Sequence, residues 1–127
     1  MIKIWKEISI SASHCLKELG EDHPCYNLHG HNYKIRVWLK QNTSDLLYDF
    51  GKVKEAMLWA TKGWDHGHLN DILEDKTNCE YLAEKLYHLM AIRYPAVFQV
   101  DVQETDTCGA SYIKDEDESE LTKRIHD

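Results

Sequence analysis

The chain of 127 residues has no run of 18 consecutive apolar residues, which is the length that a membrane-spanning helix requires. Its first residues, MIKIWK, also lack the basic segment followed by an apolar segment that marks a secretory signal peptide. These two absences predict a soluble, cytoplasmic protein that has no membrane partner.

Basic residues are scarce, because 15 Lys and Arg stand against 22 Asp and Glu and the formal net charge is −7. A surface that binds nucleic acid is basic, so this balance argues against a nucleic-acid partner. It remains compatible with a phosphorylated small molecule, since a few local Lys or Arg side chains are enough to hold one.

No C-x-x-C pair occurs among the four cysteines, although the usual structural zinc knuckle requires one. Without export, we expect all four thiols to be reduced. Repeats, linkers and low-complexity stretches are absent from the body of the chain. The length predicts one domain over residues 1–114, followed by a charged, solvated tail over residues 115–127 that begins with five acids in six residues.

Alternation of apolar and polar residues predicts four strands. Residues 2–14 and 33–39 carry an apolar side chain at nearly every second position, with Trp38 as an exception in the second segment. This period is typical of half-buried strands. Residues 98–103 predict a third strand, and residues 110–114 predict a short fourth one.

Apolar spacings of three and four predict two helices between the second and third strands. Asp49 can cap a helix over residues 50–60. Thr77 and Glu80 have the capping-box form, at the start of a helix that ends near Pro95. The order ββααββ predicts an α+β fold, a four-stranded antiparallel sheet with two helices on one face. Because two small helices cannot cover both faces, we expect apolar sheet surface to meet another copy of the chain.

The most informative stretch is CYNLHGH at residues 25–31, which places a thiol and two imidazoles just before the second strand. His29 and His31 share the parity of Tyr33, so both rings point to the apolar side if the strand extends back through them. His14 lies on the apolar face of the first strand. Three neutral imidazoles match the ligand count of a catalytic zinc site, which leaves one position for water or substrate.

Each part of this pattern also has an ordinary explanation. An isolated H-x-H is more often a hydrogen-bonded or surface pair, and an isolated Cys25 is more often a small buried hydrophobe. Adjacent Asp and His residues, such as Asp65 and His66, are common in loops. Glu104 ends the apolar face of the third strand, where a salt bridge would account for it. A purely structural zinc site of Cys25 and histidines stays open, but the combination with His14 favours an open catalytic site.

Several short motifs occur in a fixed order along the chain. They are S-A-S-H at 11–14, Cys25, H-G-H-N-Y at 29–33, D-F at 49–50, W-D-H-G-H-L-N at 64–70, E-Y-L-A at 80–83 and V-Q-E-T at 102–105. Together they resemble the 6-pyruvoyl-tetrahydropterin synthase family, whose bacterial members include the 6-carboxy-5,6,7,8-tetrahydropterin synthases of the queuosine pathway. The resemblance runs from Ile4 to about Tyr112.

The resemblance implies the tunnelling fold, in which three such sheets close into a twelve-stranded barrel and two trimers stack as a hexamer. The expected protein partner is therefore a further copy of the chain, in a trimer or a dimer of trimers. The expected cofactor is Zn²⁺, bound by His14, His29 and His31.

The resemblance also implies roles for the other candidate residues. Glu104 anchors the pterin ring by accepting hydrogen bonds from a ring nitrogen and the exocyclic amine, and Glu80 is a second substrate-binding residue. Cys25, Asp65 and His66 form a proton-transfer group, so that Cys25, Asp65, His66 and Glu104 are the catalytic candidates.

The implied activity is that of a zinc-dependent lyase acting on 7,8-dihydroneopterin triphosphate. The bacterial type cleaves the side chain and gives 6-carboxy-5,6,7,8-tetrahydropterin, acetaldehyde and triphosphate, and the compact chain resembles this type more. The alternatives are a 6-pyruvoyl-tetrahydropterin synthase activity on the same substrate and, from another class, a non-catalytic zinc-stabilised pterin-binding module, in which Cys25 and His66 would be dispensable.

Overall fold

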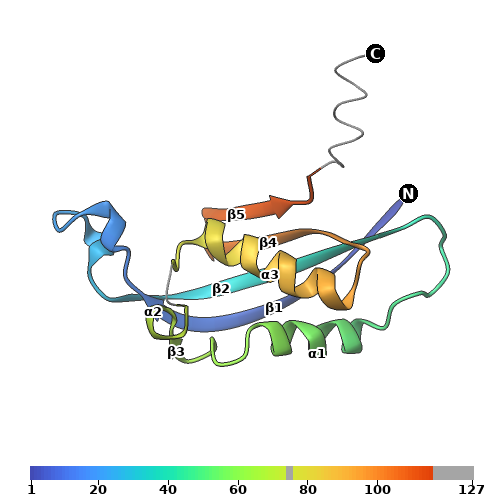
Figure 1. Ribbon diagram of the computed structural model, residues 1–127, viewed down its shortest axis with the longest axis horizontal. Coiled ribbons are helices and arrows are strands. Elements are labelled where there is room, and N and C mark those ends of the chain that lie inside the picture. The colour runs from blue at the N-terminus through green and yellow to red at the C-terminus, as the bar shows by residue number, and fades with distance from the viewer. Residues whose placement is uncertain (74–75, 116–127) are drawn as a thin grey trace, which may run out of the picture.

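The computed structural model of the protein describes residues 1–73 and 76–115 (Figure 1). Residues 116–127 of the predicted charged tail lie outside the described residues. The elements in chain order are β1 (Ile2–His14), the 3-10 turns η1 (Lys17–Leu19) and η2 (Pro24–Tyr26), β2 (His29–Gln41), α1 (Phe50–Ala60), β3 (Gly67–His68), α2 (Leu69–Ile72), α3 (Cys79–Arg93), β4 (Val97–Thr105) and β5 (Cys108–Ile113). No helix within the described ranges is long and apolar enough to cross a membrane.

The sheet has five strands in the order β3-β1-β2-β4-β5. The four predicted strands pair antiparallel, as expected. The prediction of a purely antiparallel four-stranded sheet is nevertheless wrong, because β3 pairs parallel with β1 through Ala12↔Gly67 and Ser13↔His68. The short α2 adds a third α-helix to the two predicted ones. A two-residue strand and a single helical turn are too short to produce a periodic pattern.

The register of the long hairpin positions the histidines. β1 and β2 pair over their whole length, so that His14 lies opposite His29 and Ala12 lies opposite His31. Strand β2 begins at His29, as the predicted backward extension requires. Residues of one parity face the same side of a sheet, which brings the three imidazoles to one face at one end of the hairpin.

Helices α1 and α3 cover that same face, and the core lies between them and the sheet. Side chains from β1, β2, β4, α1 and α3 are buried there, among them Ile10, Ile35, Val100, Met57 and Leu86. The chain's own two helices therefore cover this apolar face. The expectation that further apolar sheet surface meets another copy stays a prediction.

The opposite face of the sheet is mostly polar, although Trp5 and Trp38 also lie on it. On it Arg36 pairs with Glu7 at 3.0 Å, and the indole nitrogen of Trp38 donates to Asp101 at 2.7 Å. Trp38, the exception to the alternation, therefore lies on the polar face, where its ring N–H has an acceptor.

The helix starts agree with the sequence at α1 and differ at α3. Asp49 caps α1 by accepting from the Gly51 N–H at 2.8 Å. The predicted capping box of Thr77 and Glu80 is wrong, because the N-cap of α3 is Asn78 and no side chain caps it. The Thr77 carbonyl instead contacts His14, and the Glu80 carboxylate accepts from Asn78.

Candidate active site

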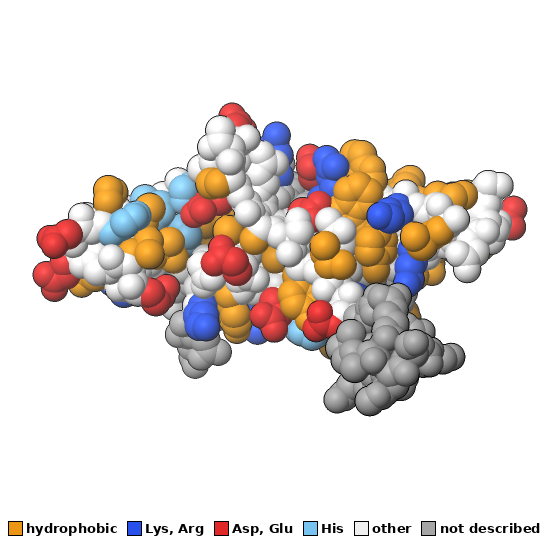
Figure 2. Space-filling view, turned by 90° about the horizontal axis from the view of Figure 1, so that it is seen from above, with side chains coloured by type: hydrophobic (Ala, Val, Ile, Leu, Met, Phe, Trp, Pro, Cys, Tyr) orange, Lys and Arg blue, Asp and Glu red, His pale blue; other side chains and the backbone are white. Residues whose placement is uncertain are grey.

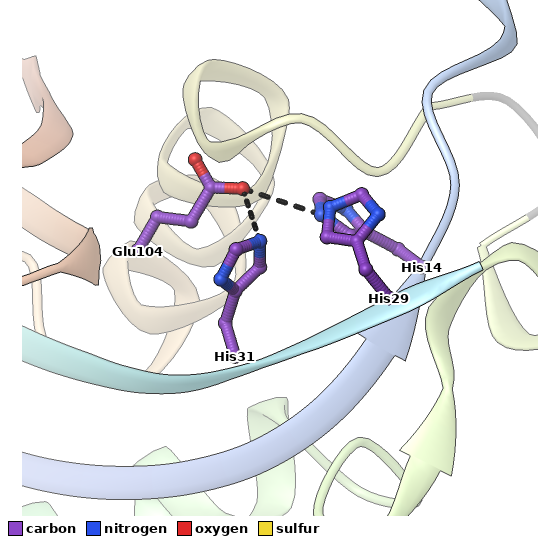
Figure 3. Close-up of side chains that lie close together, drawn as sticks. All are labelled: His14, His29, His31 and Glu104. Carbon is purple, nitrogen blue, oxygen red and sulfur yellow. Dashed lines mark ion pairs between the residues drawn. The ribbon is translucent and has the colours of Figure 1, made fainter. Parts of the chain in front are cut away.

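Three imidazoles and one carboxylate converge at the end of the β1–β2 hairpin (Figure 3). The candidate ligand atoms of His14, His29, His31 and Glu104 all lie within 4.8 Å of one another. His14 is fully buried, and the other three are partly buried. In the space-filling view, histidine side chains gather toward one end of the molecule (Figure 2).

Backbone carbonyls orient two of the rings. Nδ1 of His14 lies 2.9 Å from the Thr77 carbonyl oxygen, and Nδ1 of His29 lies 2.8 Å from the Asn27 carbonyl oxygen. A carbonyl only accepts, so each Nδ1 carries the proton and each Nε2 carries a lone pair. This carbonyl–imidazole arrangement is typical of histidines that bind a metal through Nε2.

The three Nε2 atoms have no hydrogen-bond partner among the described residues, although they are buried. Glu104 Oε1 nevertheless approaches His31 Nε2 to 2.9 Å and His14 Nε2 to 3.2 Å. At His14 a carboxylate oxygen therefore faces a lone pair, which is unfavourable unless a positive charge lies between them. A metal ion held by these atoms would supply that charge.

Burial lowers the pKa of His14 and of His31 below the ordinary histidine value. The neutral ring is favoured as a result, and the neutral ring is the form that binds a metal. Three imidazoles with an exchangeable fourth position suit Zn²⁺, and the residues present therefore fit the expected cofactor.

A cavity of about 450 Å³ opens beside the histidine cluster. Its lining includes Glu104, Glu80, Asn78 and Cys79. Both predicted substrate-binding carboxylates thus face one hollow, which is large enough for a small bicyclic ring.

Glu80 is held at this cavity by two neighbours. Its carboxylate accepts from the Asn78 amide at 2.9 Å and from the Cys79 thiol at 3.1 Å, and these donors lower its pKa. Burial raises the pKa of Cys79 to about 12, so this thiol stays protonated and donates at neutral pH.

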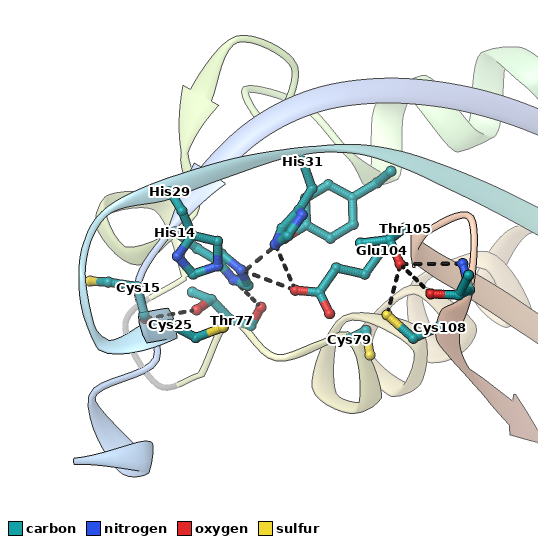
Figure 4. Close-up of polar contacts among 12 residues, drawn as sticks. His14, Cys15, Cys25, His29, His31, Thr77, Cys79, Glu104, Thr105 and Cys108 are labelled. Carbon is teal, nitrogen blue, oxygen red and sulfur yellow. Dashed lines mark hydrogen bonds and ion pairs between the residues drawn. The ribbon is translucent and has the colours of Figure 1, made fainter. Parts of the chain in front are cut away.

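Cys25 lies in η2, the turn before His29. The Leu16 N–H donates to the Cys25 carbonyl at 2.8 Å, which ties this turn to the chain two residues after His14. Figure 4 draws Cys25 together with the three histidines and Glu104. The Cys25 side chain is partly exposed, and no hydrogen bond joins its thiol to the histidine cluster in the part of the chain that the structure describes.

Asp65 and His66 lie at the edge of β1 and form a contact of 3.1 Å between Oδ2 and Nδ1. The other carboxylate oxygen of Asp65 accepts from the Ser11 N–H at 2.9 Å, and this bond and then His66 lower the pKa of Asp65. His66 adopts a positive φ of 59°, which is uncommon for a residue other than glycine. Its side chain is 84% exposed.

Two of the predicted catalytic residues, Glu104 and His66, line separate hollows. Glu104 lines the cavity beside the histidines, whereas His66 lines a second one of about 380 Å³ with Ser11 and Asn32. Ser11 and Asn32 have the opposite parity to the histidine cluster, whereas Ala12 and His31, which also line this hollow, share the parity of the cluster. Within one chain, the structure does not bring His66 to Glu104.

Three further groups shape the site and were not among the predicted site residues. They are the Thr77 carbonyl, the Asn27 carbonyl and the Tyr33 hydroxyl, which lies 3.3 Å from His14 Nδ1. Tyr33 could have been found from its shared parity with His31. The two carbonyls belong to the backbone, which every residue has, so the sequence contains no signal for them.

Comparison with protein families finds a match to the family described as 6-pyruvoyl tetrahydropterin synthase over residues 3–115. The chain is similar to the 6-carboxy-5,6,7,8-tetrahydropterin synthase of Rickettsia typhi, with 30% identity over 96 residues that cover 70% of this chain and 68% of the relative. The protein of the same name from Helicobacter pylori is 32% identical over 60 residues, which cover 45% of this chain and 30% of the relative.

Among solved structures, the fold is similar to that of Caenorhabditis elegans 6-pyruvoyl tetrahydropterin synthase, with a TM-score of 0.76 and 24% identity. The alignment covers 90% of this chain and 96% of that one. The corresponding synthase of Plasmodium vivax has a TM-score of 0.64 and 16% identity, with 91% of this chain and 98% of that one covered.

Proposed function

Because the chain belongs to the 6-pyruvoyl tetrahydropterin synthase family, an enzyme family of lyases, we propose that it is a zinc-dependent 6-carboxy-5,6,7,8-tetrahydropterin synthase. Its substrate is 7,8-dihydroneopterin triphosphate, and acetaldehyde and triphosphate are released. The reaction is a step of queuosine biosynthesis and takes place in the cytoplasm. Relatives about 30% identical that carry this name support the choice of product.

The observation that carries the proposal is the convergence of three Nε2 atoms next to a cavity lined by two carboxylates. His14, His29 and His31 would hold Zn²⁺. When bound there, the ion supplies Lewis-acid chemistry, which polarises oxygen atoms of the substrate side chain and acidifies neighbouring C–H bonds.

Glu104 and Glu80 would hold the pterin ring in the cavity. The pterin edge presents a ring N–H beside an exocyclic amine, and a carboxylate can accept from both donors at once. Glu104 is the second-last residue of β4, and its carboxylate lines the cavity.

Cys25 would take protons from the substrate side chain and return them. Asp65 would fix His66 with the proton on Nδ1, which leaves Nε2 free to exchange a proton. Because His66 and Glu104 line different hollows of one chain, we propose that the complete site takes residues from more than one subunit of a trimer or a dimer of trimers.

Product analysis tests the function. The zinc-loaded protein is incubated with 7,8-dihydroneopterin triphosphate, the pterins are identified by mass spectrometry, and released acetaldehyde is trapped. We expect 6-carboxy-5,6,7,8-tetrahydropterin and an equal amount of acetaldehyde. A pterin that keeps its three-carbon side chain would assign the 6-pyruvoyl activity instead, and unchanged substrate would favour the non-catalytic binding module.

A further inference from the structure

Glu104 lies where it can serve either the metal or the pterin. Oε1 is 2.9 Å from His31 Nε2 and 3.2 Å from His14 Nε2. Two donors on a tetrahedral zinc ion are about 3.3 Å apart, given zinc–nitrogen bonds of about 2.0–2.1 Å. The carboxylate oxygen is therefore already at the spacing that a fourth zinc ligand takes from two of the others.

The same carboxylate also borders the cavity. Figure 3 shows one oxygen turned toward the imidazoles and the other turned away from them. Glu104 is the residue that the histidine cluster and the cavity lining share. Its side chain is 18% exposed, so it is not locked into the core.

The two tasks exclude each other. Gripping the pterin edge through both its N–H and its amine requires both oxygens of one carboxylate, whereas ligating the metal takes one of them. The carboxylate that closes the metal site must leave it in order to hold the ring.

We propose that Glu104 is the fourth protein ligand of the metal in the substrate-free protein, and that it moves from the metal to the pterin edge when the ring enters the cavity. This inference rests on the proposed function, because it requires a metal at the histidine cluster and a pterin in the cavity. The fourth metal position then becomes available only when a pterin is bound, so that water and stray anions do not occupy it beforehand.

Metal binding tests the first half of the proposal. Chelator-treated wild-type protein and its Glu104→Gln and Glu80→Gln variants are titrated with Zn²⁺ against a chromophoric chelator. We expect Glu104→Gln to weaken zinc binding at least tenfold, since even outer-shell changes cost about 10–100-fold. Glu80→Gln is the matched control, because Glu80 lines the same cavity but is not in the ligand group, and its zinc affinity should equal that of the wild type. Circular dichroism verifies that both variants are folded.

Cobalt spectroscopy tests the second half. Co²⁺ replaces zinc in the same three proteins, and a pterin without a side chain is added, so that only the ring can act. In the wild type, we expect the visible cobalt bands to shift as the carboxylate leaves, and in Glu104→Gln we expect no shift.

Three outcomes distinguish this inference from the function on which it rests. Equal zinc affinity in the wild type and Glu104→Gln overturns the inference and leaves the metal site intact. A cobalt spectrum that does not change at saturating pterin also overturns it. A wild-type protein that binds no metal at all overturns the metal-dependent function together with the inference.

Discussion

At the scale of single residues, the geometry of the site is set by hydrogen bonds that occupy one polar atom of a side chain and leave the other atom free. The carbonyls of Thr77 and Asn27 engage Nδ1 of His14 and His29, so both Nε2 lone pairs point at a common centre. The backbone N–H of Ser11 engages one oxygen of Asp65, so only the other oxygen faces His66. These bonds fix the orientation of groups that would otherwise rotate, which prepares the site before any ligand binds.

Replacing Cys25 should separate chemistry from metal binding. We expect Cys25→Ala to fold and to keep its zinc, while turnover falls by at least about 10²–10⁴-fold, as is typical when a proton-transfer group is removed. Zinc content and product formation are measured on the same preparation. Cys15→Ala, another partly buried thiol next to the site, is the control and should remain active. Loss of zinc from Cys25→Ala would instead assign the thiol to a structural metal site.

Asp65 should contribute to the pH dependence of stability. Its pKa is lowered in the folded protein by the Ser11 N–H and by His66, so the unfolded chain binds the proton more readily. The stabilising contribution is therefore present above the unfolded value of about 3.9 and is lost as the pH falls through the lower folded pKa. We expect Asp65→Asn to lack this part of the acid-induced loss, as measured by urea denaturation between about pH 3 and pH 6. Parallel curves for the two proteins would contradict the assignment.

At the scale of elements, the smallest strand positions the exposed catalytic candidates. β3 pairs with only two residues of β1, yet it fixes the loop that carries Asp65 and His66 against Ser11. The His66 N–H also donates to the Ser11 carbonyl, at 2.6 Å. The position of the loop that carries Asp65 and His66 is therefore set by backbone contacts of this loop and of β3 with β1.

Gly67→Ala should disturb this element. A Cβ at residue 67 would be too close to the Gly63 carbonyl oxygen and 2.8 Å from Ile72 Cδ1, so the backbone would have to shift. We expect a loss of about 1–3 kcal/mol in the free energy of unfolding, as is typical of overpacking, together with reduced turnover. Urea denaturation measures the loss. Gly30→Ala is the control for stability, since its Cβ would make only an ordinary contact of 3.6 Å with the Ala12 carbonyl oxygen. Equal stability of the two variants would rule out the crowding argument.

At the scale of the whole molecule, the sheet has two open edges. β3 covers only the last part of the outer edge of β1, and nothing in the described residues pairs with the outer edge of β5 (Cys108–Ile113). Open edges pair readily with strands of other chains. Two features therefore give reason to expect assembly: the open edges of the sheet, and a divided site in which His66 and Glu104 line different hollows of one chain. The apolar face under α1 and α3 gives no such reason, because these helices already cover it.

We predict that the protein is a trimer or a dimer of trimers in solution. Light scattering at micromolar concentration should give about three or six times the chain mass of 14.9 kDa. Mixing inactive Cys25→Ala with inactive His66→Ala should restore part of the activity, because a shared site can then combine one intact copy of each residue. A stable and fully active monomer would contradict both the assembly and the divided site.

The sequence by itself determined the four long strands, the two main helices and the common face of His14, His29 and His31. Those features follow from local periodicity, since parity along a strand fixes which side each residue faces. The N-cap of α1 at Asp49 could also be predicted from the sequence, because the Asp49 side chain accepts a hydrogen bond from the N–H of Gly51, only two residues away.

Only the tertiary structure decided the features that depend on residues distant in the chain. Glu104 meets His14 across 90 positions of sequence, and Asp65 meets Ser11 across 54. The shift of the α3 cap from Thr77 to Asn78 has the same origin, because the Thr77 carbonyl is engaged by His14. A local pattern cannot encode such contacts, since they arise when packed elements bring backbone groups together and backbone groups are the same in every residue.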